Sequence, residues 1–538
     1  MRVVAPDVER SSTGHAITAS CPLSYRATQI SGLTAFRVNG TPADCVALGA
    51  HQWSGVDLVL SGLNIGFNLG NAIWHSGTLA AAKQAVLLGI RGIALSAPAS
   101  AEPDFDPYKP WMRQVLDLLL HEQSLPLVNV NFPRHPRGAS RWPYRLPGPA
   151  STQLGVDMEH LERVLAAHAL SLGAEIRRGH GVDGFEPSNE DVIVWTGDER
   201  IHARWLVGCD GGRSTVRKRA NFEFVGTEPE FTGYSVQVDI ADPPVLPLGR
   251  HHTAAGMYNQ SQPGVIAMAD FDGGAAHRTQ PLTCEHVQSV LRRVSGTDVT
   301  LKAMNVAATW TDRSKQATTY RKGRVLLAGD AAHIHSPLGG QGLNLGLGDA
   351  MNLGWKLAAT HRGDAPTGLL DSYTTERHPV GARILDWTRA QVALMRPGSG
   401  ALRGVVRDLI ETRDGATYFA EHVWGVSLRY DREGHPLVGH SCPDFELEDG
   451  TRVGALLRDG HGLLLDFGRR ASLGGLEGFW SDRVRYVHLD ARDRLGLVAL
   501  LVRPDGFVAW ASDTTPRPEE VTRAAARWFA SRQHVDQR

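Results

Sequence analysis

Hydrophobic and polar positions in the first part of the chain follow strand and helix periods in turn. Apolar residues run together over 56–60 and 92–96, which predicts two buried strands, and the alanine-rich segment 76–88 between them predicts a helix. A strand, a glycine-containing loop, a helix and a second strand in this order are typical of a parallel βαβ unit. We therefore expect an α/β module at the N-terminal side of the chain.

A proline-rich stretch then interrupts this pattern. Five prolines fall within the eighteen residues 132–149. Proline lacks a backbone donor and is excluded from helix interiors and central strands. We expect a linker over residues 134–150.

Apolar spacing beyond the linker predicts further elements. A helix is expected over 157–172, with Asp157 as its N-cap and Gly173 as its end. Short strands are predicted at 176–178, 192–195, 205–210 and 325–330, with a second sheet over 231–315 and a long helix over about 342–360. Strands at 462–466, 497–502 and 507–510 predict a small α/β tail.

Composition narrows the class of protein. A chain of 538 residues is too long for one ordinary core, so several domains are expected. Hydrophobic residues at 42% and charged residues at 21% are ordinary for a globular protein, and a net charge of -1 argues against a nucleic-acid polymer as partner. The five cysteines form no CxxC pair, and no apolar run is long enough for a membrane span or a signal peptide. We expect a cytoplasmic protein without structural zinc.

The richest candidate site begins where the 325–330 strand ends. Asp330 is placed there at the carboxyl end of a parallel sheet, where α/β folds bind ligands, and its carboxylate can accept hydrogen bonds from ribityl or ribose hydroxyls. Glycine recurs five times between 339 and 348, which allows close approach to a flat ligand. The helix that follows directs its positive end toward that ligand. A glycine-rich turn that only packs a helix on a sheet remains the alternative.

A second segment repeats this design about 120 residues earlier. The strand over 205–210 ends at Asp210-Gly211, and Arg213 and Ser214 open a polar helix start. Taken alone, the Asp-Gly pair is a common turn and Ser214 an ordinary helix cap.

Together the two segments resemble the paired Asp-Gly and Gly-Asp motifs of the para-hydroxybenzoate hydroxylase superfamily, and most closely its rifampicin monooxygenase and polyketide hydroxylase branches. The resemblance extends over residues 144–538 and includes the motifs at 370–379, 480–483 and 503–506. It implies FAD, reduction by NAD(P)H, and transfer of an oxygen atom from O₂ to an electron-rich aromatic ring.

The resemblance also implies site residues. Asp330 would contact the ribityl chain. The substitution Asp330→Ala is therefore expected to weaken flavin retention more than Asp349→Ala does. Asp210, Gly211, Arg213 and Ser214 would lie near the flavin pyrophosphate and any nicotinamide path. The residues expected to flank the isoalloxazine are Pro337, Gly339, Gly340, Gln341, Gly342, Leu343 and Asn344. No general base is identified. This family normally begins with a strand that leads into a Gly-x-Gly-x-x-Gly turn, and no such turn precedes the helix expected over 157–172. The spacing occurs in the sequence only at Gly179, Gly181 and Gly184.

Residues 1–133 resemble a different family, the SurE-type survival-protein nucleotidases. The matching segments are 3–7, 9–18, 40–46, 61–70, 76–78 and 128–133. This resemblance implies a divalent metal, Mg²⁺ or Mn²⁺, held by oxygen ligands, with Ser11 and Asn64 at two ligand positions. Residues 76–78, which open a helix, would suit a phosphate cradle. The family's Asp-Asp pair has no counterpart here.

The combined prediction is an α/β chain with a partial Rossmann-like SurE-type module, an incomplete FAD-binding domain, a substrate-binding sheet domain and a thioredoxin-like tail without CxxC. The expected boundaries are 1–133, the linker 134–150, 151–220 with 316–395 for FAD, 221–315 for substrate, 396–440 as a helical connection, and 441–538. Three functions stay open. They are an FAD-dependent monooxygenase acting on an aromatic polyketide, phenolic or antibiotic-like substrate, a metal-dependent nucleotidase, and an inactive fusion protein.

Overall fold

The computed structural model divides the chain into two compact units, residues 1–145 with 155–157 and residues 146–154 with 158–538. The structure describes residues 2–8, 17–18, 22–30, 32–65, 76–97, 105–121, 125–132, 156–279, 281–431, 433–468, 473–480 and 483–531. The linker predicted over 134–150 lies outside the described residues.

The first unit holds two small sheets and three described helices, and its predicted βαβ pattern is confirmed. In one sheet β1 (Val3–Pro6) pairs in parallel with β3 (Leu33–Val38), and β2 (Tyr25–Ile30) completes it. In the other, β4 (Leu58–Ile65), β5 (Arg91–Ala97) and β6 (Leu127–Asn131) are parallel. The helices are α1 (Pro42–Gln52), α3 (Gly77–Leu87) and α4 (Lys109–His121).

The alanines of α3 explain how this helix packs. Ala80, Ala81, Ala82 and Ala85 are buried, and a Cβ atom on Gly92 of β5 would lie 2.2 Å from the carbonyl oxygen of Ala82. Small side chains on the helix and none on the strand therefore allow backbone-to-backbone approach.

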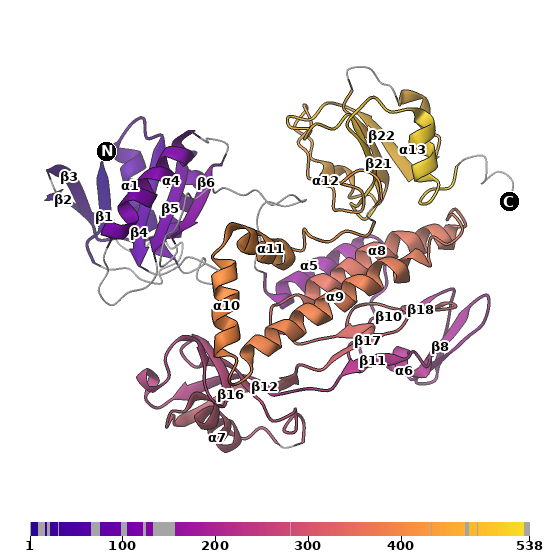
Figure 1. Ribbon diagram of the computed structural model, residues 1–538, viewed down its shortest axis with the longest axis horizontal. Helices are drawn as coiled ribbons and strands as arrows, with labels where there is room; N and C mark the ends of the chain where they lie inside the picture. The colour runs from indigo at the N-terminus through magenta and orange to yellow at the C-terminus, as the bar shows by residue number, and fades with distance from the viewer. Residues whose placement is uncertain are drawn as a thin grey trace. The chain divides into compact units, whose positions relative to one another are not determined.

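The central part of the second unit carries the two segments singled out from the sequence. β10 (Leu206–Gly208) pairs in parallel with β19 (Val325–Leu327), and β18 (Arg321–Lys322) adds an antiparallel edge. The long helices α8 (Gly342–Arg362) and α9 (Ser372–Met395) run side by side along this layer (Figure 1). A second small sheet has the order β11–β17–β20. Its strands are β11 (Phe224–Thr227), β17 (Ser314–Ala317) and β20 (His333–Ile334).

The region after the linker confirms the predicted helix and corrects one strand. The helix α5 covers Met158–Ser171. Residues 176–178 form no strand; instead β7 (Gly184–Pro187) pairs with β8 (Val192–Thr196), which pairs with β9 (Glu199–Ala203). Residues 176–178 are exposed and lie just before Gly179, whose φ is +80°. They have no apolar face to bury, so local β propensity alone does not make a strand.

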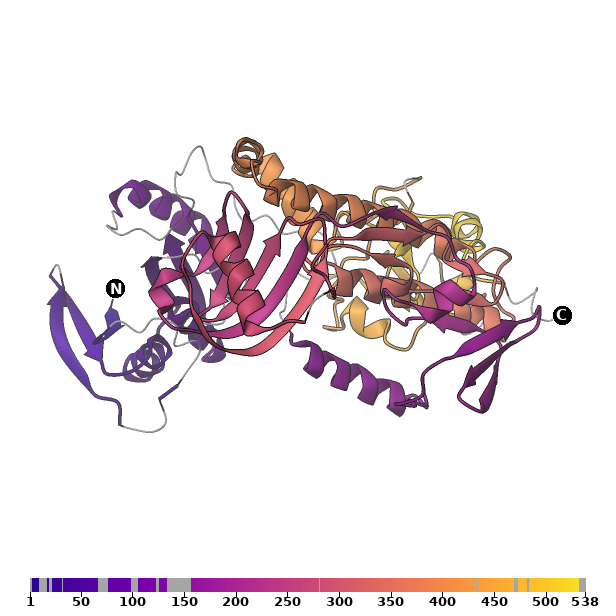
Figure 2. The same cartoon turned by 90° about the horizontal axis from the view of Figure 1, so that it is seen from below.

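The second sheet predicted over 231–315 is confirmed as a five-stranded antiparallel sheet in the order β13–β14–β15–β12–β16. Its strands are Gly249–His252, Gly256–Gln262, Val265–Asp270, Thr232–Ile240 and Leu301–Thr311. The amphipathic helix α7 (Cys284–Ser295) covers one face (Figure 2) and buries Val287, Leu291 and Val294 against Tyr234 and Met268.

Four further described helices and a C-terminal sheet belong to the second unit. The helices α10 (Gly400–Ile410) and α11 (Arg413–Trp424) follow α9. The C-terminal sheet, defined here as β21 to β24, has the order β22–β21–β23–β24, with strands Val484–His488, Gly462–Asp466, Ala499–Val502 and Val508–Ser512. The helices α12 (Val453–Leu456) and α13 (Pro518–Ala525) flank it. Across the described ranges, no helix combines the length and apolarity needed to span a bilayer.

Candidate functional site

The parallel pairing of β10 with β19 brings the two predicted segments to one sheet edge. Leu206 is paired with Val325 and Gly208 with Leu327, and the Ala328 N–H donates to the Gly208 carbonyl at 3.0 Å. Because parallel strands end at the same edge, the turns that carry Asp210 and Asp330 both leave the sheet there.

The Asp330 turn is exposed on one side and tightly packed on the other. It forms a short 3₁₀ turn, Gly329–Ala331, with φ of +61° at Gly329, and the Asp330 side chain is exposed. A Cβ atom on Gly346 of α8 would lie 3.5 Å from the Gly329 Cα atom. Within the described part of the chain, no hydrogen bond to the Asp330 carboxylate is found. The carboxylate is therefore available to a ligand.

The glycine-rich loop after β20 packs against α9 and α11. Gly339 and Gly340 have φ of +100° and +67°, and a Cβ atom on Gly339 would lie 2.7 Å from the Gln391 side-chain oxygen. The Gln341 amide donates to the His422 carbonyl of α11 at 3.2 Å. Glycine is required here because the backbone is left-handed and a neighbouring side chain fills the space that a Cβ atom would need.

The N-terminus of α8 opens at this loop. Its N-cap residue, Gln341, makes no side-chain capping bond, so the first-turn N–H groups of a 21-residue helix remain without a cap. Pro337, Leu343 and Asn344 are exposed around this end. Uncapped N–H groups and the positive end of the helix dipole suit an anionic or electron-rich ligand edge.

The Asp210 carboxylate is engaged by its own helix. Oδ1 accepts from the Ser214 hydroxyl at 2.5 Å, and Oδ2 accepts from the Thr215 and Val216 N–H groups at 2.6 and 3.1 Å. Ser214 is buried and caps α6 (Thr215–Arg219) by accepting from the Arg217 N–H at 2.9 Å. These hydrogen bonds build the turn and the start of α6, and the predicted position near the flavin pyrophosphate stays a prediction. Arg213 is exposed beside them.

Arg217, which the sequence analysis did not select, ties the two turns together. Its guanidinium is buried and donates to the Ala331 carbonyl at 3.0 Å and to the Gly212 carbonyl at 2.8 Å. The Cζ atom lies 3.9 Å from the Phe224 ring centroid. One cation therefore links the Asp-Gly turn to the Gly-Asp turn.

Asp349 is a buried support of the Gly329–Ala331 turn. Its carboxylate accepts from the Gly329 N–H at 2.9 Å, from His333 Nε2 at 2.7 Å and from Arg377 Nε at 2.7 Å. Burial alone would raise the pKa of this carboxyl, but the His333 hydrogen bond and the Arg377 charge hold the pKa below its ordinary value. Asp349 was predicted to matter less than Asp330 for flavin retention, but it supports the turn that carries Asp330. Asp349→Ala is therefore not a suitable control for Asp330→Ala.

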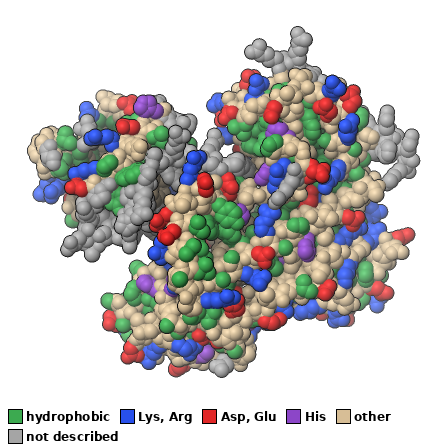
Figure 3. All heavy atoms as spheres, in the orientation of Figure 1, with side chains coloured by type: hydrophobic (Ala, Val, Ile, Leu, Met, Phe, Trp, Pro, Cys, Tyr) green, Lys and Arg blue, Asp and Glu red, His purple; other side chains and the backbone are tan. Residues whose placement is uncertain are grey.

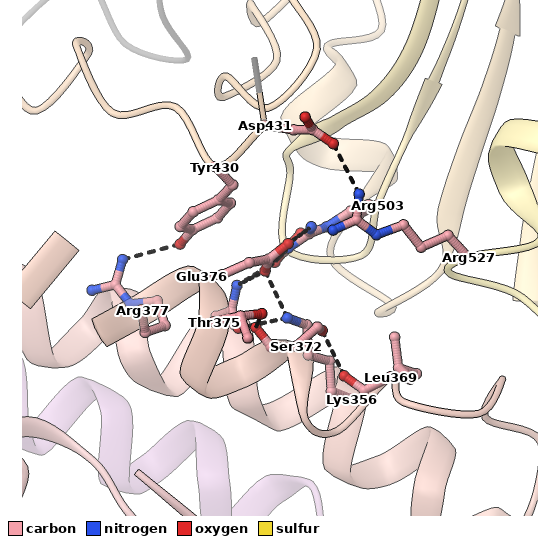
Figure 4. Close-up of polar contacts among 12 residues, drawn as sticks. Lys356, Leu369, Ser372, Thr375, Glu376, Arg377, Tyr430, Asp431, Arg503 and Arg527 are labelled. Atoms are coloured by element: carbon pink, nitrogen blue, oxygen red, sulfur yellow. Dashed lines mark hydrogen bonds and ion pairs between the residues drawn. The ribbon is translucent and has the colours of Figure 1, made fainter. Parts of the chain in front are cut away.

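A second buried group of charges joins α8 and α9 to the C-terminal sheet (Figure 4). Glu376 of α9 accepts from Lys356 at 2.6 Å, from Asn352 at 2.7 Å, and from Arg503 Nη1 and Nη2 at 2.6 and 3.0 Å. Arg503 also donates from Nε to Asp505 at 3.0 Å. The sequence motifs at 370–379 and 503–506 contained these residues, but no local signal shows that their charges are buried against one another.

Glu376 makes the stability of the second unit depend on acidity. Burial by itself raises the pKa of this carboxyl, but the charges of Arg503 and Lys356 lower the pKa to about 2, from an ordinary value of 4.5. Since the folded pKa lies below the unfolded value, the gain in stability is complete above pH 4.5 and is lost as the pH falls toward 2. Thermal unfolding followed by circular dichroism should show a falling midpoint over this acidic range and a flatter profile in Glu376→Gln. An equally steep profile in that variant would contradict the assignment.

The metal and phosphate positions predicted in the first unit lie partly outside the described residues. Ser11 lies outside the described residues, and Asn64 lies near the end of β4. The Ser76 hydroxyl of the predicted phosphate cradle accepts from the Leu79 N–H at 3.0 Å and caps α3. Among the residues that the structure describes, no group of three or more histidine, cysteine, aspartate or glutamate side chains is placed to hold a metal.

Three family models match the chain. Residues 136–388 match the FAD binding domain, residues 435–531 match the aromatic-ring hydroxylase C-terminal domain, and residues 1–154 match the survival protein SurE family. The first two models together cover most of the second unit, which contains both sheet-edge turns and the C-terminal sheet.

Curated relatives and solved structures agree with the first two models. A monooxygenase of Claviceps purpurea is 44% identical over 395 residues, covering 72% of this chain and 78% of that protein. Rifampicin monooxygenase of Streptomyces venezuelae is 41% identical over 407 residues, covering 73% and 83%. The OxyS anhydrotetracycline hydroxylase from Streptomyces rimosus superposes with a TM-score of 0.63 at 38% identity, covering 70% and 80% of the two chains. CabE, an aromatic hydroxylase from angucycline biosynthesis, gives 0.65 at 30%, covering 89% and 100%.

The chain belongs to the family of FAD-dependent aromatic-ring monooxygenases, and its catalytic class is that of an FAD-dependent aromatic monooxygenase. Its mixed α/β fold with several small sheets matches the hydroxylase structures. The SurE match of the N-terminal residues is an additional feature of this chain. The residues at the sheet edge fit the ribityl and ring portion of FAD, because an exposed carboxylate, left-handed glycines and an uncapped helix start meet there.

Proposed function

We propose that the second unit binds FAD at the β10–β19 edge and uses NAD(P)H and O₂ to hydroxylate a polycyclic aromatic substrate of the polyketide or antibiotic type. The observation that carries this proposal is the exposed Asp330 carboxylate, in a turn whose Gly329 packs against Gly346 near the uncapped start of α8. FAD, when bound, supplies the redox chemistry that takes electrons from NAD(P)H and transfers one oxygen atom of O₂ to the ring, while the protein binds, orients and shields the reactants.

Each part of the edge has a separate task in this proposal. The Asp330 carboxylate accepts hydrogen bonds from the ribityl hydroxyls. These hydrogen bonds are stronger than neutral ones because the acceptor is charged. The first-turn N–H groups of α8 donate to the electron-rich edge of the ring system. Gly339 and Gly340 let the backbone approach the flat ring. Gly211 and the exposed Arg213 face the phosphate side, since the Asp210 and Ser214 side chains are engaged in capping.

An aromatic cluster next to the glycine-rich loop supports a planar substrate. The Trp387 ring is stacked on His422 with centroids 5.1 Å apart, and Tyr418 and Phe419 of α11 lie within 6.3 and 5.5 Å of Trp387. His422 is the residue whose carbonyl accepts from Gln341 of the loop. Offset and tilted aromatic rings favour association with a fused aromatic ligand.

One polar atom of this cluster and one of the adjoining loop lack hydrogen-bond partners in the part of the chain that the structure describes. Gln341 Oε1 and Trp387 Nε1 are buried and have no hydrogen-bond partner among the described residues. An acceptor and a donor left unsatisfied in this way cost free energy unless a ligand or water completes them. A substrate that carries both hydroxyl and carbonyl groups would offer a donor to Gln341 Oε1 and an acceptor to Trp387 Nε1.

The apolar face of α10 and α11 is consistent with a hydrophobic substrate. Leu402, Val405, Leu409, Tyr418 and Val423 are exposed on these helices, and hydrophobic side chains gather over them in Figure 3.

The test combines cofactor loading with oxygenation. Purified protein incubated with FAD and separated from free flavin should stay yellow and oxidise NADH or NADPH faster when anhydrotetracycline or rifampicin is added. The product should be one oxygen atom heavier and should carry the label from ¹⁸O₂. A protein that retains no flavin after reconstitution would overturn the cofactor placement. Retained flavin with no added oxygen in any fused aromatic compound would overturn the substrate class.

A further inference from the structure

We propose that Arg503, which follows β23 of the C-terminal sheet, is a positioning residue for the flavin site. Its guanidinium holds Glu376 and thereby fixes α9, so that Arg377 and Asp349 keep the Gly329–Ala331 turn in place. The inference rests on the proposed flavin position at Asp330. It gives a role to the sequence motifs at 370–379 and 503–506, which the monooxygenase site leaves without one.

The contacts of Arg503 fix its guanidinium in one position. Arg503 is buried, forms a two-pronged contact with Glu376, and contacts Asp505 of its own turn. Its Cζ atom lies 4.3 Å from the Trp528 ring centroid and 5.5 Å from that of Trp355 on α8. A planar guanidinium held both by carboxylates in its plane and by aromatic rings has no alternative arrangement within the same space.

Two neighbouring residues of α9 contact different parts of the second unit. Glu376 contacts Arg503, while Arg377 donates from Nε to Asp349 and from Nη2 to the Leu345 carbonyl of α8 at 2.7 and 2.9 Å. Successive helix residues are separated by about 100° around the axis, so α9 cannot rotate to satisfy one contact without displacing the other.

Tyr430 links the same two arginines directly. Its hydroxyl accepts from Arg377 Nη1 at 3.0 Å, and its ring centroid lies 5.4 Å from the Arg503 Cζ atom (Figure 4). The absence of a side chain at Gly348 matters for Arg377, since a Cβ atom there would lie 2.9 Å from its Nη2 atom. The glycine at 348 therefore provides the space through which the guanidinium reaches Asp349.

The last contact reaches the flavin side. Asp349 accepts from the Gly329 N–H at 2.9 Å, one residue before Asp330. A shift of Arg377 thus moves the acceptor that fixes the turn carrying the ribityl-binding carboxylate. The route thus consists of side-chain hydrogen bonds joined by the backbone of α9. A change that acts through it should affect residues 325–335 specifically, whereas a general loss of stability should not.

The experiment measures that segment in the flavin-free protein and FAD affinity in the loaded one. Hydrogen exchange of peptides covering 325–335 is compared in the wild type, Arg503→Met, Arg503→Lys and the charge-balanced pair Arg503→Met with Glu376→Gln. The control, Leu465→Ala, removes a fully buried side chain of the same C-terminal sheet that lies outside the ion network. All proteins are compared at a temperature where circular dichroism shows a folded state.

We expect faster exchange at 325–335 and a roughly 3- to 30-fold higher FAD Kd in Arg503→Met and in the paired variant. Arg503→Lys should recover part of both effects, because it restores the charge but not the two-pronged geometry. Leu465→Ala should lower the thermal midpoint and leave both measurements at the wild-type value.

Unchanged exchange and Kd in the paired variant would overturn the proposal, as would a Leu465→Ala result equal to that of Arg503→Met. If both Arg503→Met proteins fail to fold, Arg503→Lys decides, and a wild-type Kd and exchange rate there would overturn it. Failure of the wild type to take up FAD would remove the proposed function instead, while the exchange comparison would still test the connection.

Discussion

Asp349→Ala is expected to destabilise the second unit by about 3–5 kcal/mol, the usual cost of leaving one member of a buried ion pair alone. The side chain is fully buried and accepts from Arg377, His333 and the Gly329 N–H. Its removal leaves the Nε–H of the buried Arg377 and the Gly329 N–H without an acceptor, while Arg377 keeps its bonds to Leu345 and Tyr430.

Urea unfolding followed by tryptophan fluorescence measures this loss. Asp198→Ala is the matched control, because Asp198 is an exposed aspartate in the β8–β9 turn, and its replacement should change stability by no more than about 0.5 kcal/mol. A loss below about 1 kcal/mol in Asp349→Ala would show that water or relaxation replaces the three contacts, against the geometry described here.

Asp330→Ala is expected to weaken FAD binding by about 1.5–3 kcal/mol, the range for a hydrogen bond to a charged group, which is about a 10- to 150-fold increase in Kd. Unlike Asp349, this side chain is exposed and supports no described neighbour, so folding stability should be unchanged. Asp330→Ala is therefore expected to change FAD affinity alone, whereas Asp349→Ala is expected to lower stability and also to weaken FAD binding through the Gly329–Ala331 turn.

Fluorescence titration of the flavin-free protein gives the Kd, and Asp198→Ala again serves as the control. Asp330→Asn should fall between the wild type and Asp330→Ala, because the amide oxygen still accepts but carries no charge. A wild-type Kd in Asp330→Ala would place the flavin elsewhere and would remove the main support for the assigned orientation.

The sheet-edge geometry was accessible from sequence because local patterns specify it. Runs of three or four apolar residues before Asp210 and Asp330 identify buried parallel strands, and such strands place their following turns at one edge. The glycines of the 339–348 segment were predicted to approach a flat ligand. In the structure Gly339 and Gly346 lie close to protein neighbours, Gln391 and Gly329, and the approach to a ligand stays a prediction.

Other parts of the site depend on contacts that no local pattern encodes. Glu376 and Arg503 are 127 residues apart, and each would read as an ordinary solvated charge in isolation. The capping role of Asp210 was equally hidden, because an Asp-Gly turn that binds a ligand and one that caps a helix have the same sequence. The strand predicted at 176–178 failed because strand formation requires a partner and a buried face.

The contact between α9 and the turn after β23 also limits how this protein can be recombined with its relatives. A hybrid that takes its tail from another hydroxylase inherits a foreign partner for Glu376. It will fold well only if the donor places an arginine and an aspartate at the positions of Arg503 and Asp505. Crossover points for domain shuffling should therefore keep these positions and the middle of α9 from the same parent.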